Sequence, residues 1–509
     1  MSSTSTHLVA NCIHTWSHAR PLVTFCARVV KMKPDLHVTF LVTSLLFERL
    51  NKEKARSFDV GDESAQRLRI VSMGATTDMI GDGQIEPWWR ALVAGEEIVC
   101  KQTDTRYAPL PTPPAVIFDV VGVKNIGIVR AISGKSVKIY ALWPALTYSI
   151  LQLFGDTHVG GLGNIHERAE EESRRSGRDF ADVAVEIITS KRGDVIRMQG
   201  LPPMYDYEYY PQEALGDGKA IVDVLSRVNE VNKTVDGAIL ISCLSWEKDA
   251  VQTARDWMAE TSRSVFIAGP LLPTASKSTS TENEKSQSPQ GAEIQAFLTK
   301  TLETSGRHSL LYISFGSMNW PVKISDKLWA FLDVVMELNI PFIMSAASPL
   351  AVVPDEVNEK VKTYGKGVIS TWTPQQMILD HPATGWYVSH GGQNSVTESI
   401  AAGVPFIMWP FSADQPINAV LATDVHKVGY ELLEVRSGPG LQKIFRTGYT
   451  PIGTVEAVKD EARDILRRAF GEDGKEKRAR LQALQQAALG DWEEGGASRR
   501  DVAAFLASL

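Results

Sequence analysis

The sequence predicts an α/β protein built from two doubly wound parallel sheets, and three observations support this. Short runs rich in Val, Ile, Leu and Phe alternate with amphipathic segments of helix length in both halves of the chain. This is the pattern of βαβ units whose sheet is covered on both faces. The alternation is broken by a polar stretch over residues 274–293. A chain of 509 residues is also too long for one ordinary core and suits two large domains.

The first half of the chain supplies seven predicted strands, with helical segments such as 21–32 and 124–133 between them. The strands are expected at residues 7–13, 37–44, 68–74, 115–122, 137–144, 237–244 and 264–273. Residues 155–211 are less periodic, and we expect only loops and helices there.

Residues 274–293 are rich in Ser, Thr, Glu and Lys and contain almost no apolar side chains. Such a segment cannot bury enough surface to order itself. We therefore expect a flexible linker over 273–303, which separates a domain at 1–272 from a second domain at 304–490.

The second half repeats the alternation and ends in charged helices. Strands are expected at 310–317, 340–346, 367–372, 384–390 and 404–410, and helices at 323–338, 374–381, 394–403, 417–429, 454–470, 475–490 and 501–509. Two facing α/β domains form a natural cleft, and open α/β sheets bind ligands beyond the carboxyl ends of their strands.

Composition excludes several classes of function. The net charge of −7 argues against an electrostatic nucleic-acid binder, which needs a basic face. No stretch approaches the ~20 apolar residues of a membrane span. The four cysteines include no C-x-x-C pair, which argues against a zinc or thioredoxin-type site. The first residues lack the basic region of a secretory signal, so we expect a cytoplasmic protein.

The most informative polar cluster follows the predicted strand 384–390. It reads His390-Gly391-Gly392-Gln393-Asn394-Ser395 and opens a helix. Two glycines allow close approach of a ligand to the backbone, and the N-terminus of a helix attracts anions. A plain Gly-Gly turn with a Ser cap is the competing interpretation.

Other polar or aromatic residues follow neighbouring strands. Ser317 ends one strand, and Trp372 ends another and offers a flat apolar face. Glu398 lies one turn into the helix and could accept hydrogen bonds from a diol. Asp414 and Gln415 could hold sugar hydroxyls, although Asp414 could equally cap the next helix.

The span from Trp372 to Gln415 resembles the donor-binding signature of the family-1 UDP-sugar-dependent glycosyltransferases. The matching pattern is W-x-P-Q, I-L-x-H, H-x-G-x-N-S, a Glu three residues later, G-V-P, W-P and a final D-Q. The resemblance departs from the plant pattern HCGWNS, because Gly391 replaces Cys and Gln393 replaces Trp, as in many microbial and animal relatives.

The resemblance implies a role for each matched position. Trp372 would stack on uracil, with Gln375 near the base and ribose, and Glu398 would hold the ribose hydroxyls. Asp414 and Gln415 would hold the transferred sugar, with glucose favoured by Gln415. The diphosphate would be bound by Ser317, His390, Gly392, Asn394 and Ser395.

The N-terminal half carries the second part of the resemblance. His18 falls at the histidine of the family's G-H-x-x-P loop, with Ser17 in place of Gly. A histidine can act as a general base near neutral pH. Asp119, at the end of strand 115–122, resembles the carboxylate that orients such a base; its alternative role is a helix cap. Trp16 and Trp143 are candidates for contacting a flat or lipophilic acceptor.

The resemblance implies a GT-B fold, with an acceptor-binding domain at 1–272, a UDP-sugar-binding domain at 304–490 and a helix at 491–509 that crosses back to the first domain. It implies inverting transfer of a sugar from a UDP-sugar to the hydroxyl of a small acceptor, such as a phenolic, flavonoid or polyketide. The UDP-sugar is a co-substrate, and no cofactor is expected. No D-x-D sequence is present, so no metal is required by this interpretation.

Other interpretations remain open at this point. A sterol or lipid acceptor is one, and a UDP-sugar epimerase or hydrolase on the same fold is another. A sugar-nucleotide binder without activity is disfavoured by the presence of His18 and Asp119. A nicotinamide oxidoreductase would need G-x-G-x-x-G directly after the first strand, and the sequence there is HTWSHARP.

Overall fold

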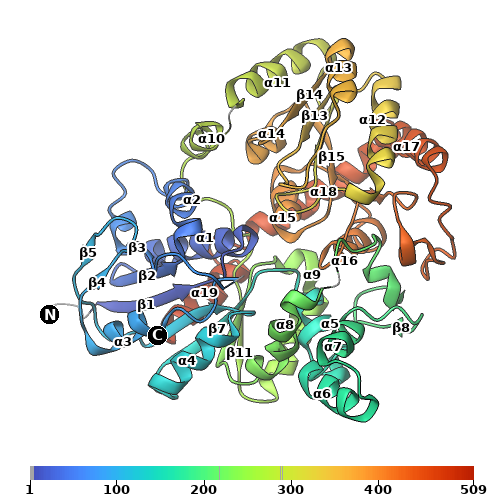
Figure 1. Cartoon of the computed structure of the whole chain (residues 1–509). Helices are drawn as coiled ribbons and strands as arrows, with labels where there is room; N and C mark the ends of the chain where they lie inside the picture. The colour runs from blue at the N-terminus through green and yellow to red at the C-terminus, as the bar shows by residue number, and fades with distance from the viewer. Residues whose placement is uncertain (1–4, 79, 217, 287, 289) are drawn as a thin grey trace. The chain divides into compact units, whose positions relative to one another are not determined.

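The structure is a computed structural model that describes residues 5–509 except 79, 217, 287 and 289. It divides into two compact units. Unit 1 contains residues 1–188, 218–283 and 490–509, and unit 2 contains 189–217 and 284–489. Each unit is built on its own parallel sheet (Figure 1).

The sheet of unit 1 has the order β11-β10-β7-β6-β1-β2-β3, and every neighbouring pair is parallel. Its strands are β1 (Thr6–Asn11), β2 (Leu36–Val42), β3 (Leu68–Ser72), β6 (Ala115–Asp119), β7 (Lys138–Trp143), β10 (Gly237–Leu240) and β11 (Ser264–Ile267). The chain runs from β1 outward through β2 and β3, and then returns to place β6 on the other side of β1. This reversal of direction leaves a crevice at the carboxyl ends of β1 and β6, where open sheets bind ligands.

The helices of unit 1 fall between these strands. They are α1 (Trp16–Met32), α2 (Ser44–Ala55), α3 (Glu86–Ala94), α4 (Val123–Ser133), α5 (Thr147–Phe154), α6 (Ile165–Ser176), α7 (Phe180–Ile188), α8 (Lys219–Asn232), α9 (Leu244–Ala259) and α19 (Ala497–Ala507). A short antiparallel pair is added by β4 (Ile98–Val99) and β5 (Arg106–Tyr107).

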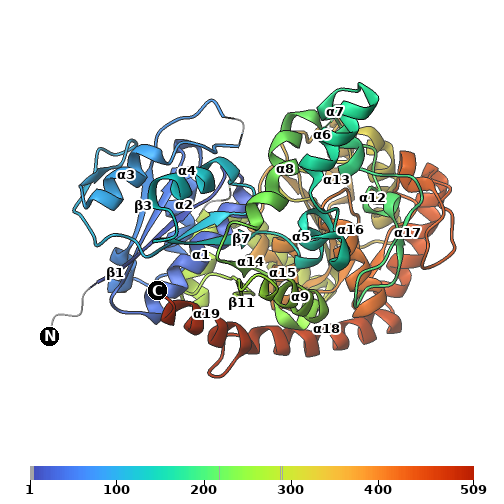
Figure 2. The ribbon, with the colours of Figure 1, turned by 90° about the horizontal axis from the view of Figure 1, so that it is seen from below.

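The last helix, α19, packs into unit 1 although the preceding helix belongs to unit 2 (Figure 2). Its Phe505 ring lies 5.9 Å from Phe25 of α1 and 5.0 Å from Tyr140 of β7, centroid to centroid. Asp501 accepts hydrogen bonds from Arg255 at 2.6 Å and from the backbone N–H of Ile267 at 2.8 Å. The expected return of the C-terminal helix to the first domain is thereby confirmed.

Unit 2 has a sheet in the order β14-β13-β12-β15-β16-β17, again parallel throughout. Its strands are β12 (Leu310–Ser314), β13 (Phe342–Ser345), β14 (Gly367–Ser370), β15 (Thr384–Ser389), β16 (Phe406–Met408) and β17 (Gly429–Glu431). The direction of the chain reverses between β12 and β15, so the crevice of this unit lies at the carboxyl ends of these two strands.

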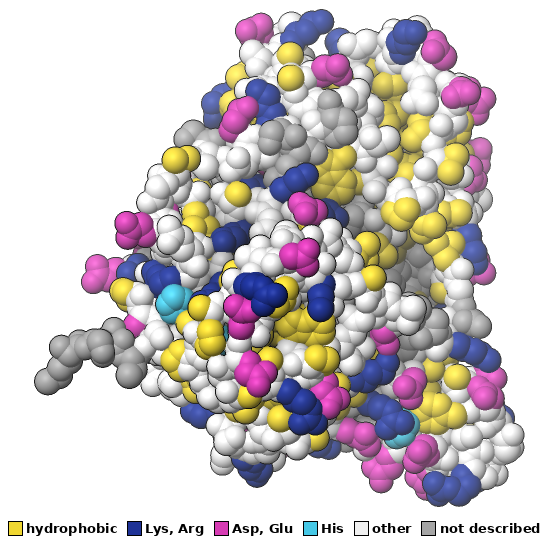
Figure 3. All heavy atoms as spheres, turned by 60° about the vertical axis from the view of Figure 1, so that its left-hand side comes forward, with side chains coloured by type: hydrophobic (Ala, Val, Ile, Leu, Met, Phe, Trp, Pro, Cys, Tyr) yellow, Lys and Arg dark blue, Asp and Glu magenta, His cyan; other side chains and the backbone are white. Residues whose placement is uncertain are grey.

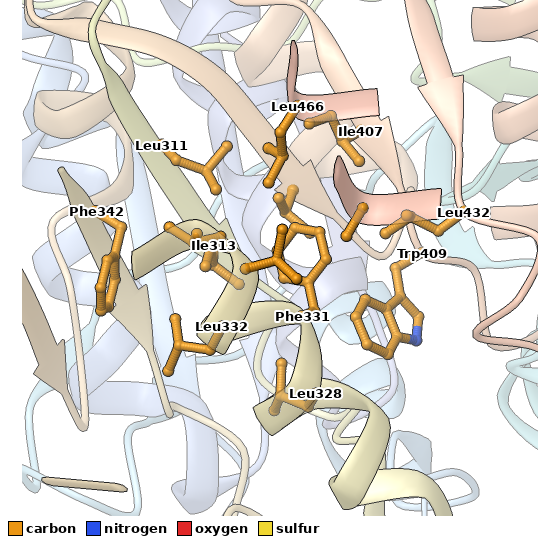
Figure 4. Close-up of a cluster of buried hydrophobic side chains, with 14 of the residues drawn as sticks. Leu311, Ile313, Leu328, Phe331, Leu332, Phe342, Ile407, Trp409, Leu432 and Leu466 are labelled. Carbon is orange, nitrogen blue, oxygen red and sulfur yellow. The ribbon is translucent and has the colours of Figure 1, made fainter. Parts of the chain in front are cut away.

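Alternating side chains of β12 supply both faces of the unit 2 core. Leu311 and Ile313 pack with α12 (Ser325–Glu337) and α17 (Val455–Ala469), and Figure 4 shows this cluster around Phe331 and Trp409. Leu310 and Tyr312 face the opposite cluster, which includes α11 (Gly291–Ser305) and α14 (Gln375–Asp380). A strand buried on both faces explains why its sequence is continuously apolar. The remaining helices are α13 (Asp355–Tyr364), α15 (Gln393–Ala402), α16 (Gln415–Val420) and α18 (Glu472–Gly490).

Two segments differ from the sequence prediction. The expected linker at 273–303 forms α10 (Lys277–Ser286) and most of α11, and its residues 287 and 289 lie outside the described part of the chain. Helix α11 is ordered because Ile294 and Leu298 are completely buried in the core of unit 2.

Residues 189–217 lie in unit 2, although the prediction assigned them to a continuous first domain at 1–272. This segment contains the short pair β8 (Val195–Ile196) and β9 (Met204–Tyr205). The Tyr207 hydroxyl donates to the Lys443 carbonyl at 2.6 Å, and the buried Glu208 pairs with Arg446 at 3.3 Å. These contacts join residues more than 200 positions apart, so no local pattern could predict them.

Charged side chains of both signs are interspersed on the face shown in Figure 3. In the part of the chain that the structure describes, no helix is both long enough and apolar enough to span a membrane.

Candidate functional site

In unit 1, the carboxyl ends of β1 and β6 bring His18 and Asp119 together. Asp119 is the last residue of β6, and His18 lies in the first turn of α1, just after β1. Asp119 Oδ2 lies 2.6 Å from His18 Nδ1. Asp119 is fully buried, while 22% of the His18 side chain is exposed. The predicted pair therefore exists, with its carboxylate inside and its imidazole at the surface.

Asp119 is held in place by its second oxygen, which accepts a hydrogen bond from the backbone N–H of Val121 at 3.1 Å. With Nδ1 of His18 directed at the carboxylate, Nε2 is the ring nitrogen left to exchange a proton with a ligand. The nearby Cys12 is buried, and burial together with the Asp119 charge raises the pKa of its thiol well above the usual value. This thiol therefore stays protonated at neutral pH.

A loop beside this pair was missed by sequence analysis. Asp82 accepts hydrogen bonds from the backbone N–H groups of Lys124 at 2.7 Å and Asn125 at 3.0 Å, which caps α4. Burial raises the pKa of Asp82. Asn125 in turn binds Asn11, the last residue of β1, at 3.0 Å. The loop at 80–85 is thus fastened to the same sheet edge, and the Asp-Gly pair at 82–83 was the signal for its turn.

The two predicted acceptor contacts lie in different environments. The Trp16 ring is half-buried, with the Arg49 guanidinium 3.9 Å from its centroid. Trp143 is completely buried and packs against Trp257 at 6.4 Å between centroids. The indole of Trp143 therefore belongs to the core of unit 1 and has no exposed surface for an acceptor.

In unit 2, the turns after β12 and β15 lie against each other. Gly316 has a φ of +74°, and a Cβ built on it would lie 2.8 Å from His390 Cε1. A Cβ on Gly392 would lie 2.5 Å from His390 Nε2. Only glycine fits at either position, and Ser317 and Asn394 follow these turns as half-buried residues. The sequence motif therefore packs two loops around one imidazole.

His390 is itself buried, and burial lowers its pKa to about 4, with a hydrogen bond to the Ser314 backbone acting in the opposite direction. At neutral pH the ring is uncharged. Any anion it binds is therefore held by a hydrogen bond and not by charge pairing.

The first turn of α15 is partly satisfied from within the unit. Asp414 Oδ2 accepts a hydrogen bond from the backbone N–H of Gln393 at 2.9 Å. Gln415 Oε1 accepts from the N–H groups of Phe411 at 2.8 Å and Ser412 at 3.2 Å. Of the two residues expected to hold a sugar, Asp414 thus binds the first turn of α15, and Gln415 holds the loop before α16.

Gln375, Ser395 and Glu398 form a connected network. Gln375 Nε2 donates to Glu398 Oε2 at 2.5 Å and to Ser395 Oγ at 3.3 Å. Its Oε1 accepts from the hydroxyls of Tyr312 at 3.2 Å and Tyr387 at 3.1 Å. Glu398 is buried, so its carboxylate is held in one position for a partner. Trp372, three residues before Gln375, is half-buried.

Gln393, which stands where plant sequences have Trp, is also buried. Asn418 donates to Gln393 Oε1 at 3.3 Å and to the Gly391 carbonyl at 2.8 Å. Asn418 was not singled out from the sequence, yet it joins the loop after β15 to α16. The sequence signal for this contact is the D-Q-x-x-N spacing that places Asn418 one turn after Asp414.

These residues meet because β14, β12, β15 and β16 end at one edge of the sheet. The edge offers a buried carboxylate, amides, hydroxyls, a neutral imidazole and a helix N-terminus, which are groups suited to a diol and a phosphate. Among the residues described in either unit, no cluster of three or more His, Cys, Asp or Glu is placed to hold a metal ion.

Comparison with known proteins agrees with this chemistry. Residues 236–436 match the family model described as UDP-glucoronosyl and UDP-glucosyl transferase. The chain is 30% identical to UDP-glycosyltransferase eriJ of Hericium erinaceus, over 99% of each sequence. It is 31% identical to UDP-glucose flavonoid 3-O-glucosyltransferase 7 of Fragaria ananassa, over 41% of this chain and 42% of that protein.

Solved structures show the same fold over almost the whole chain. One is the UGT2 of Phytolacca americana complexed with UDP-2-fluoro-glucose and pterostilbene, at a TM-score of 0.68, 18% identity and 99% coverage of both chains. A transferase from Siraitia grosvenorii in complex with UDP matches at a TM-score of 0.68 and 18% identity, over 98% of this chain and 99% of that one. The predicted GT-B fold is confirmed.

Proposed function

Since the chain belongs to the family-1 UDP-glycosyltransferases, we propose that it transfers glucose from UDP-glucose to a hydroxyl of a small phenolic, flavonoid or polyketide, with inversion at the anomeric carbon. The observation that carries the mechanism is the 2.6 Å contact between His18 and the buried Asp119. A base of this kind is what attack by a hydroxyl requires.

In the proposed reaction, His18 Nε2 removes the proton of the acceptor hydroxyl. Asp119 stabilises the imidazolium that forms, because a buried carboxylate on Nδ1 fixes the ring and offsets its charge. The acceptor oxygen attacks the anomeric carbon as the bond to UDP breaks. This single displacement forms one glycosidic bond, releases UDP and uses no enzyme nucleophile.

Unit 2 would bind the donor. We assign uracil stacking to Trp372 and the ribose hydroxyls to Glu398, whose buried carboxylate already binds Gln375 at 2.5 Å. The sugar is assigned to Asp414 and Gln415. These assignments agree with the family resemblance and with the edge of the sheet at which the residues gather.

The diphosphate would gain negative charge as the bond to the sugar breaks. We assign its stabilisation to the N-terminus of α15 at Gly392, Asn394 and Ser395, together with Ser317 and the neutral His390. Preorganised N–H groups and a helix dipole stabilise such a charge without a metal. Transfer is therefore expected without added divalent cations.

The acceptor class rests on the names of similar proteins and on Trp16. The relative from Fragaria ananassa is named for flavonoid 3-O-glucosylation, and the Phytolacca americana structure holds pterostilbene. A half-buried aromatic ring two residues before His18 suits a flat acceptor near the base.

The test is mass spectrometry on the protein mixed with UDP-glucose and a panel of phenols, flavonoids, polyketides and sterols, without metal. A gain of one hexose on a phenolic, flavonoid or polyketide is the expected result. A gain on sterols alone would overturn the acceptor class. Free UDP or an altered sugar nucleotide without glycoside would replace transfer with hydrolysis or epimerisation.

A further inference from the structure

The segment that precedes α11 contacts the loop from Trp372 to Met377, which contains the proposed uracil residue Trp372 and Gln375, the partner of the proposed ribose residue Glu398. Glu284, near the end of α10, accepts hydrogen bonds from the backbone N–H groups of Gln376 at 3.1 Å and Met377 at 2.9 Å. Four residues later, the Ser288 hydroxyl donates to the Trp372 carbonyl at 2.8 Å. The segment thus binds both ends of this short loop.

Ser370 and Tyr312 hydrogen-bond to Trp372 and Thr373 in this loop, but no local side chain caps the helix that follows it. Helix α14 begins at Gln375, and the residue before it is Pro374, which makes no side-chain cap. The first N–H groups of a helix need an acceptor. Glu284 supplies a carboxylate acceptor, although it lies 92 and 93 positions before the two donors in the sequence. The residue is only 9% exposed. A charged, bidentate hydrogen bond that is shielded from water is among the stronger polar contacts in a protein.

The two ends of the loop carry different proposed functions. Trp372 would present its ring to uracil, and its carbonyl is held by Ser288 and, at 3.0 Å, by Ser370. Gln375 reaches Glu398 and Ser395 from the first turn of α14. A shift of the α14 N-terminus would therefore move Gln375 away from Glu398 and change the distance between the ring and the ribose site.

We propose that Glu284 and Ser288 are positioning residues for the uridine part of the donor, so that donor affinity depends on a segment outside the donor signature. This inference rests on the proposed function. It adds that the affinity for uridine nucleotides is set partly by two side chains that do not contact the nucleotide.

The test is calorimetric titration of UDP and UMP into the wild type, Glu284→Ala, Glu284→Gln and Ser288→Ala. We expect Kd to rise about tenfold in Glu284→Ala and about threefold in Ser288→Ala, by the same factor for UDP and UMP because both carry the uridine. Glu284→Gln keeps one acceptor oxygen and should fall between the wild type and Glu284→Ala. In transfer assays, KM for UDP-glucose should rise, while kcat and KM for the acceptor should stay within about twofold.

Thr454→Ala is the matched control. Thr454 caps α17 in the same unit by accepting the Ala457 N–H at 3.2 Å, so its loss removes a comparable helix cap elsewhere. This variant should lose thermal stability but keep the wild-type Kd for UDP.

The outcomes separate the two proposals. If the wild type binds UDP and all three variants bind it equally well, the positioning role is overturned and the proposed function stands. If Thr454→Ala weakens UDP binding as much as Glu284→Ala, the effect is general instability and the positioning role is again overturned. If the wild type binds neither UDP nor UMP, both proposals fall.

Discussion

The two units place a histidine at the same topological position and in opposite environments. In each sheet the chain direction reverses between two central strands, and a histidine lies just after one of them. His18 is partly exposed and lies 2.6 Å from a buried carboxylate. His390 is buried among glycines, and burial lowers its pKa to about 4.

The difference shows how one architecture supports two kinds of chemistry. A buried carboxylate behind an accessible imidazole fixes the orientation of the ring and leaves its other nitrogen facing outward, which suits the proposed base. A buried imidazole stays neutral and can only donate or accept a hydrogen bond, which suits a binding role. The fold supplies the position, and the surroundings of each ring decide its use.

The largest effect is expected for His18→Ala, which removes the proposed base. Transfer at saturating UDP-glucose should fall about a thousandfold, the range of general base catalysis, while the Kd for UDP stays unchanged. The control is His158→Ala, because His158 also pairs with a carboxylate, Glu260 at 3.0 Å, but on the surface with 54% of its side chain exposed. Equal activity of the two variants would refute the base assignment.

Asp119→Asn tests the carboxylate behind the ring. The amide keeps an acceptor for the Val121 N–H but removes the charge that stabilises the imidazolium. We expect a loss of about a hundredfold in kcat, the lower end of the range for general acid–base catalysis, with little change in melting temperature. A kcat within twofold of the wild type would assign Asp119 to the competing role, a structural cap at the end of β6.

Glu398→Ala tests the donor side of the comparison. It should raise KM for UDP-glucose about tenfold, as expected for losing a hydrogen bond to a charged group, and leave kcat within about threefold. Glu356→Ala, an exposed glutamate on α13 of the same unit, serves as the control. An unchanged KM in Glu398→Ala would count against its ribose role.

His390→Asn tests the neutral histidine through the pH dependence of stability. Because the folded pKa is about 4 and the unfolded value 6.5, the unfolded state binds more protons between these pH values. Stability contributed by the neutral ring is therefore present above pH 6.5 and is lost as the pH falls. From pH 7 to pH 5, the wild type should lose about 1–2 kcal/mol more unfolding free energy than the variant. Unfolding free energies are measured by urea denaturation at both pH values. If the wild type and the variant lose the same unfolding free energy, His390 is not a buried, neutral histidine.

The smallest effect is expected at the aromatic residues of unit 1. Trp16→Leu should raise KM for the acceptor about fivefold, since one partly exposed aromatic contact is worth about 1 kcal/mol. Trp143→Phe should instead lower the melting temperature without changing KM, because its ring is fully buried. A change in acceptor KM for Trp143→Phe and none for Trp16→Leu would reverse this assignment.

Both sheets could be predicted from the sequence because buried parallel strands are largely apolar, as in β12 and β16. The donor residues could be placed together because they follow neighbouring strands within one contiguous signature. The packing of residues 189–217 on unit 2 could not, because it depends on pairs such as Glu208 with Arg446, which leave no periodic trace.

Two further features escaped sequence analysis for related reasons. Glu284 lies in a polar segment whose composition suggested a linker, and its partners are backbone N–H groups, which every sequence has. Trp143 stands at a strand end like the proposed site residues, but the neighbouring Trp257 packs against its ring. The position of a residue along a strand fixes where it lies, while its exposure depends on what packs over it.

In the proposed reaction, unit 1 supplies a base and unit 2 holds the leaving group, with the sugar never bound covalently to the enzyme. The anomeric configuration of the glucoside formed from UDP-glucose tests this division. It is measured by NMR from the coupling constant between the anomeric proton and the proton on C2. A single displacement on the α-linked donor predicts a β-glucoside. An α-glucoside would require a second displacement and would contradict this division of roles.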